Sequence, residues 1–141
     1  MTPTLFGRWQ TRLFLFFTIG SIVTLPFAWG IIGNSAGIIF FRFLGYIALL
    51  GLGWDALYNF MQKFRWDRDW PAAFQLAAGI WEAMFIAIAA KVVGLPGIPS
   101  DFPLGDFVLH YSLVWLGVFT ASQTLMRILF PRWRFRGGQL F

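Results

Sequence analysis

An acidic residue, Glu82, lies inside a run of apolar residues that is long enough to cross a membrane. It follows Pro71 by about ten residues, or roughly 15 Å along a helix, which is the middle of a ~30 Å hydrocarbon layer. An ionised carboxylate at that depth costs about 2.5–3.5 kcal/mol on insertion scales. Glu82 must therefore be neutral, paired with a cation, or in contact with a water-filled space.

The neighbours of Glu82 on its own helix do not supply a cation. Lys91 is nine residues farther on and points to the opposite face, whereas Gln75 is seven residues back and shares the face of Glu82. We therefore expect Glu82 to be neutral, to face the protein interior, and to be hydrogen-bonded to Gln75 or to polar groups of other helices.

Two further groups of polar residues are expected in the cytoplasmic half of other apolar runs, at a depth similar to one another. They are Asp55, Asn59 and Gln62 in one run and Thr120, Gln123, Thr124 and Arg127 in another. The first group has spacings of four and three, so its members share one helix face. Arg127 is long enough to reach Asp55, and each charge would be costly alone, so we expect a buried ion pair between them.

Two other interpretations of these residues stay open. One is an ion or proton path, with Glu82, Asp55, Asn59, Gln75, Gln123 and Arg127 as candidate residues. The other is a binding site for the head group of a lipid or a quinone. Aromatic side chains make up 21% of the chain. They suit membrane interfaces, and they also suit stacking on a flat ligand such as a quinone or pigment.

The residue types exclude several kinds of chemistry. The chain has no cysteine and one histidine, which rules out thiolate chemistry, bis-histidine haem ligation and His/Cys metal sites. His110 is a candidate axial ligand for a pigment, although we expect an interfacial histidine. No phosphate loop, G-x-S-x-G or H-E-x-x-H motif occurs, so we assign no catalytic residue and favour a non-enzyme.

Transmembrane helices must position these residues. The chain of 141 residues is 58% hydrophobic and 12% charged, whereas soluble domains are about a quarter charged. Four apolar runs are long enough to span a bilayer. They are residues 13–32, 38–62, 72–94 and 107–130. The sequence predicts an all-α membrane protein, a four-transmembrane-helix antiparallel bundle forming a single domain over residues 1–141.

Small residues predict which helices touch. Gly51 and Gly53 in the second run and the alanines of 77–90 in the third are typical of close helix packing in lipid. We therefore expect the second and third helices to touch through these residues.

The basic residues indicate the orientation in the membrane. They gather at Arg8 and Arg12, at Lys63, Arg65 and Arg68, and at Arg132, Arg134 and Arg136. The loops 33–37 and 95–106 contain none. This alternation places both termini on the cytoplasmic side. The net charge of +5 is therefore a topology signal, and we expect contact with anionic lipids and none with nucleic acid.

Two stretches carry a resemblance to known proteins. FRFLGYIALLGLGWDALYNFMQKFRWDRDWP and the tail FPRWRFRGGQLF resemble small uncharacterised membrane proteins of cyanobacteria, which implies a plasma or thylakoid membrane. Residues 42–96 are similar to DoxX-like four-helix proteins, with an arginine, a Gly-rich helix, an aromatic loop and a helix carrying Glu82. That resemblance implies a link to quinone-dependent respiratory systems for some members. Neither resemblance assigns a role to a residue.

Three functions are compatible with these features. The first is a non-enzymatic accessory or assembly subunit of a larger membrane complex, favoured by the small size and minimal loops. The second is an oligomeric channel or proton-coupled transporter that uses Glu82 and Asp55. The third is a redox subunit that binds a quinone or pigment. Expected partners are membrane lipids and either copies of this chain or the subunits of a larger complex.

Overall fold

The computed structural model describes residues 2–141, and these residues form helices and loops without a strand. Four helical segments are long and apolar enough to cross a membrane. They are Leu5–Ala28, Ile39–Gln62, Ala72–Val93 and Leu104–Leu129. The prediction of an all-helical protein with four segments long and apolar enough to span a membrane is confirmed. The last three segments agree closely with the sequence prediction, whereas the first begins well before residue 13.

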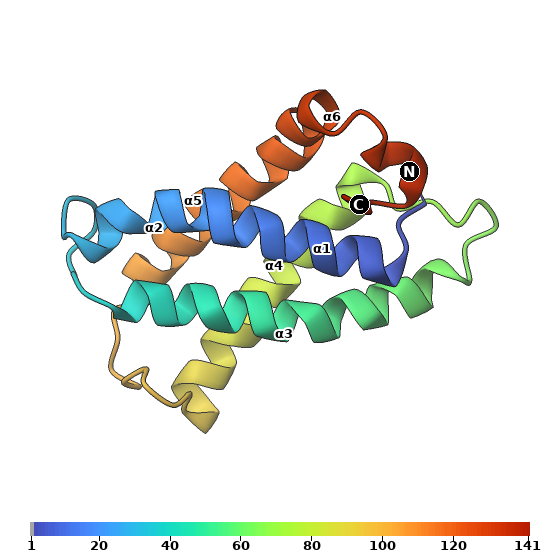
Figure 1. The fold of residues 1–141 in the computed structure, drawn as a ribbon. Helices are drawn as coiled ribbons and strands as arrows, with labels where there is room; N and C mark the ends of the chain where they lie inside the picture. Colours follow the sequence, from blue (N-terminus) through green and yellow to red (C-terminus); the bar gives the residue numbers. More distant parts are fainter. Residues whose placement is uncertain (1) are drawn as a thin grey trace.

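The four segments are built from shorter elements (Figure 1). In chain order these are α1 (Leu5–Leu15), the π-helical η1 (Phe16–Gly20), α2 (Ser21–Ala28), α3 (Ile39–Gln62), α4 (Ala72–Ile88), the π-helical η2 (Ala89–Val93), α5 (Leu104–Gln123), α6 (Leu125–Leu129) and the 3₁₀ turn η3 (Trp133–Arg136). The first three elements follow one another without a loop, so Arg8 and Arg12 lie within a span and not before it.

The first span begins early because of its N-cap. The side-chain oxygen of Thr4 accepts a hydrogen bond from the backbone N–H of Gly7 at 3.1 Å, which satisfies one of the free donors of the first helical turn. The helix then continues through Arg8 and Arg12, both of which have partners inside the protein.

The aromatic core lies between α2, α3 and α5. Phe27 of α2 and Phe40 of α3 are fully buried and pack with ring centroids 5.2 Å apart. Both rings contact His110 of α5, at 5.0 and 5.2 Å. The start of α3 thus packs against the end of the first span, and α3 continues alongside α1 (Figure 1).

The helices α3 and α4 meet through large aromatic residues. The ring of Trp54 contacts Phe85 at 5.2 Å and Trp81 at 5.9 Å, both edge to face. Gly53 is exposed, with open space where a side chain would extend. The prediction that these helices touch through Gly51 and Gly53 is wrong, because indole and phenyl rings fill the contact instead.

The two ends of the chain are held together at one end of the bundle. The backbone N–H of Thr4 donates to the carbonyl of Gly137 at 2.8 Å. The indole N–H of Trp133 donates to the hydroxyl of Thr11 at 2.8 Å. A side chain at Gly7 would collide with the Gly137 carbonyl, so the glycine permits this close approach. The C-terminal tail is thereby fixed against the first turns of α1.

The loop between α3 and α4 also lies at this end. Arg65 and Asp67 form a surface ion pair at 2.9 Å, and the hydrogen bond from Arg65 lowers the pKa of Asp67. The start of α1, the loop 63–71 and the C-terminal tail, which carry the three basic clusters of the sequence, lie at the same end of the molecule (Figure 1).

Candidate functional site

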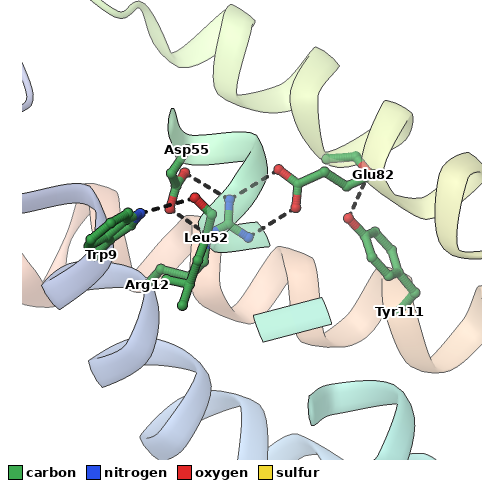
Figure 2. A network of polar contacts seen from close by, with 7 residues as sticks. Trp9, Arg12, Leu52, Asp55, Glu82 and Tyr111 are labelled. Atoms are coloured by element: carbon green, nitrogen blue, oxygen red, sulfur yellow. Dashed lines mark hydrogen bonds and ion pairs between the residues drawn. The ribbon is translucent and has the colours of Figure 1, made fainter. Parts of the chain in front are cut away.

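Arg12 of α1 joins two buried carboxylates, those of Asp55 on α3 and Glu82 on α4 (Figure 2). Its Nε donates to Asp55 Oδ2 at 2.7 Å, and its Nη2 donates to Asp55 Oδ1 at 3.0 Å. On the other side, Nη1 donates to Glu82 Oε2 at 2.9 Å and Nη2 to Glu82 Oε1 at 3.0 Å. One guanidinium thus makes a two-bond contact with each carboxylate, which is the strongest geometry for such pairs.

Arg12, Asp55 and Glu82 form a buried ion network in which every carboxylate oxygen accepts a hydrogen bond. Asp55 and Glu82 are each 4% exposed, and all four of their carboxylate oxygens accept a hydrogen bond from Arg12. Such a network fixes α1, α3 and α4 relative to one another. Removing one member would leave a buried charge without its partner, which typically costs about 3–5 kcal/mol.

A glycine makes room for the guanidinium. Gly51 is buried one turn before Asp55 on α3, and a β-carbon added there would collide with the guanidinium of Arg12. The indole N–H of Trp9 donates to the carbonyl of Leu52 at 3.0 Å and holds α1 against the same turn (Figure 2). Gly51 therefore serves the ion network and not the packing between α3 and α4.

Two tyrosines border Glu82. The Tyr111 hydroxyl donates to the carbonyl of Gly79 at 2.7 Å, one turn before Glu82 on α4. The Tyr58 hydroxyl is buried next to the Glu82 carboxylate but makes no hydrogen bond of good geometry to a described residue. Tyr58 thus provides a hydroxyl donor beside the ion network.

A second polar cluster lies nearer the chain ends. Arg8 donates from Nη2 to Gln62 Oε1 at 2.8 Å, and its guanidinium carbon lies 4.6 Å from the ring centroid of Trp70. Gln62 in turn donates to the carbonyl of Arg68 at 2.7 Å and ties the loop to α3. The Nε of Arg8 is buried and has no hydrogen-bond partner among residues 2–141.

A third polar cluster connects α4 to the end of α5. Gln75 Nε2 donates to Ser122 Oγ at 3.3 Å, and Gln123 Nε2 donates to Gln75 Oε1 at 3.2 Å. Arg127 then donates to Gln123 Oε1 at 2.6 Å. Gln75 and Gln123 were both candidates from the sequence, and the structure brings them together.

These three clusters surround one cavity of about 340 Å³. It lies between α1, α4 and α5, in the region where α1 and α4 are bridged by the contact from Arg12 to Glu82. Its lining includes residues of the ion network and of the second and third polar clusters, together with apolar and aromatic side chains. The main lining residues are Arg8, Arg12, Leu15, Phe16, Asp55, Tyr58, Asp69, Trp70, Gln75, Ala78, Glu82, Trp115, Val118, Ser122, Gln123, Arg127, Trp133 and Arg134.

Two sequence expectations about ion pairs are wrong. Asp55 pairs with Arg12, and Arg127 is hydrogen-bonded to Gln123 instead. Glu82 does face the interior, as expected, but a cation of its own chain reaches it. The sequence interpretation placed Arg12 outside the membrane, so the partner of both carboxylates was missed. The signal was Thr4 as an N-cap, which puts Arg12 about 10 Å inside the helix at 1.5 Å per residue.

Two other candidates lie away from the cavity. Asn59 is half-buried and does not line it. His110 is fully buried, with its Nε2 2.9 Å from the Thr24 hydroxyl and its ring between two phenylalanines. That environment leaves no open face on which a pigment could bind, and the side chain is not exposed at an interface. The described residues also contain no group of three His, Cys, Asp or Glu side chains that could hold a metal ion.

Fold and site together define an all-helical protein with four segments able to span a membrane and a polar cavity between them. Comparison with known proteins does not narrow this class. No family model, no curated protein and no solved structure matches the chain.

Proposed function

We propose that this protein is an integral membrane protein that binds a small amphipathic ligand in the cavity between α1, α4 and α5. The observation that carries the proposal is the cavity itself, about 340 Å³ in volume, with a buried ion network on one wall. Ligand sites in proteins are typically concave, about 300–1,000 Å³, mainly apolar, and furnished with a few fixed polar groups. The volume of this cavity lies in that range and its polar groups are fixed, but its lining holds more polar and charged side chains than a typical ligand site.

The ion network supports a rigid binding site. Its carboxylates are held by a guanidinium, so the wall that they form is fixed before a ligand arrives. Preformed polar groups lower the cost of ordering on binding. Trp70, Trp115 and Trp133 add flat apolar surface around the same space.

We further propose an antiparallel bundle with both termini on the cytoplasmic side of a plasma or thylakoid membrane. The basic clusters at the chain ends and in the loop 63–71 support this orientation. Reporter fusions after Gly37 and after Ser100 should both locate outside the cytoplasm. A cytoplasmic reporter at either position would contradict the orientation.

The other two functions differ in their support. A proton or ion path would need Glu82 and Asp55 to exchange partners, and their present contacts with Arg12 occupy all of their oxygens. The accessory-subunit function stays a prediction without a structural observation in its favour. The ligand-binding proposal is therefore the one with geometric support.

Filling the cavity should remove a bound ligand. Ala78 lines the cavity, whereas the adjacent Ala77 is exposed and outside its lining. We expect Ala78→Trp to lose a small molecule that copurifies with the unmodified protein, because the indole would occupy the ligand's space. Native mass measurement after gentle extraction into detergent would show the loss.

The matched control is Ala77→Trp, which adds the same side chain to the outward face of the same helix. It should retain the bound mass. If neither the unmodified protein nor Ala77→Trp carries an added mass after extraction from native membranes, or if Ala78→Trp retains it, the proposed function is wrong.

A further inference from the structure

We propose that the ligand carries an acidic head group, bound by Arg8, Arg127 and Arg134 at the end of the cavity nearest the chain ends. The inference rests on the proposed function and names the chemical class of ligand for that cavity. Its basis is an uneven distribution of charge and of hydrogen-bond donors along the cavity wall.

The charges separate into two groups along the cavity. At the ion network, Arg12 faces two carboxylates whose oxygens are all occupied. The second group consists of the three arginines Arg8, Arg127 and Arg134 together with one carboxylate, that of Asp69. In the chain from residue 2 onward, no salt bridge joins Arg8, Arg127 or Arg134 to an acidic side chain. This end of the cavity therefore has an excess of positive charge that favours an anion.

Two of these arginines, Arg8 and Arg127, use only some of their hydrogen-bond donors within the described part of the chain. Arg8 uses Nη2 for Gln62, and its buried Nε has no partner in the described part of the chain. Arg127 uses Nη2 for Gln123 and is otherwise exposed. A guanidinium has five N–H donors in a planar fork that matches the oxygens of a carboxylate or phosphate. An acidic head group would accept these hydrogen bonds.

Depth in the bundle favours an amphiphile over a small soluble anion. Arg127 lies near the end of the span Leu104–Leu129, and Arg134 lies beyond it, at the level expected for lipid head groups. Farther into the cavity the lining includes Leu15, Phe16 and Val118. An acid with an apolar chain would place its head among the arginines and its chain beside these side chains.

Three probes distinguish an amphipathic acid from a neutral amphiphile and from a soluble anion. Dodecanoate is an amphipathic acid, its methyl ester is the neutral counterpart, and inorganic phosphate is a soluble anion without a chain. Each would be titrated into the purified full chain in a neutral detergent, with tryptophan fluorescence as the measure of binding. Trp70, Trp115 and Trp133 all line the cavity and would report occupancy.

The expected result is dodecanoate binding that weakens about tenfold or more in the double variant Arg127→Gln, Arg134→Gln, which loses two charge-assisted contacts. Both side chains are exposed, so the variant should fold. The matched control is Arg132→Gln, Arg136→Gln, which removes the same charge from exposed tail positions outside the cavity lining and should bind dodecanoate normally.

The remaining outcomes each decide the proposal. Phosphate binding with the same dependence on the two arginines would support the acidic chemistry and assign it to a soluble ligand. Equal binding of the methyl ester, abolished by Ala78→Trp, would overturn the acidic head group while leaving a ligand cavity. If no probe responds to Ala78→Trp, the proposed function itself is contradicted.

Discussion

Replacing Arg12 by methionine should lower the free energy of unfolding by about 3–5 kcal/mol, or prevent stable insertion altogether. The substitution leaves Asp55 and Glu82 buried, 4% exposed each, without the guanidinium that occupies all of their oxygens. Thermal unfolding in detergent, followed by the loss of monodisperse protein, would measure the effect. Arg132→Met removes an exposed arginine and should have little effect.

The triple variant Arg12→Met, Asp55→Leu, Glu82→Leu provides the second half of this test. Replacing a complete buried ion network by apolar residues is often neutral or stabilising by about 1–4 kcal/mol. We therefore expect the triple variant to recover most of the stability that Arg12→Met loses. Equal stability of Arg12→Met and the unmodified protein would show that Arg12 is not the partner of the two carboxylates.

Gly51→Leu should be nearly as damaging as the loss of Arg12, because a side chain at this position would occupy the place of the guanidinium. We expect a loss of about 3–5 kcal/mol, the range for breaking a buried ion pair. The comparison is Gly53→Leu, two residues away on the same helix, where a side chain would extend into open space.

Gly53→Leu should change the stability by less than about 1 kcal/mol, since leucine has the higher helix propensity and no atom is displaced. The two variants make the same substitution in one helix, so the difference in helix propensity cancels in the comparison. Comparable stability of the two variants would contradict the role of Gly51 as the space for Arg12.

Much of the fold followed from local sequence patterns. The runs 38–62 and 72–94 predicted α3 and the α4–η2 segment closely, because their ends are marked by charged loops and by Pro71. The start of the first helix was misplaced, since Arg8 and Arg12 were interpreted as flanking charges of a span. In the structure they are charges within the helix whose partners lie on distant segments.

The candidate site was predictable in its composition but not in its pairing. Glu82, Asp55, Gln75, Gln123 and Arg127 were singled out by depth and helix face, and all of them line the cavity. The choice between Arg12 and Arg127 as the partner of Asp55 depends on which helices are neighbours. That arrangement comes from contacts such as those of Trp54 with α4 and of Phe27 with α3, which helical periodicity does not encode.

The packing prediction failed for a related reason. Small residues permit close approach, but they do not specify what approaches. Gly51 accommodates an arginine, and Gly79 accommodates the indole of Trp115, where a side chain would collide with the ring. In both cases the neighbour is a large side chain from another helix and not a backbone.

The most direct test of the ion network is to measure the distances from Arg12 to the carboxylates of Asp55 and Glu82 in a lipid bilayer. Solid-state NMR on protein labelled at the arginine nitrogens and the carboxyl carbons can measure them. We predict that Nη2 of Arg12 contacts both carboxylates, with one oxygen of each at 3.0 Å. A contact between Asp55 and Arg127, or a Glu82 carboxyl group remote from Arg12, would contradict the ion network on which the proposed cavity depends.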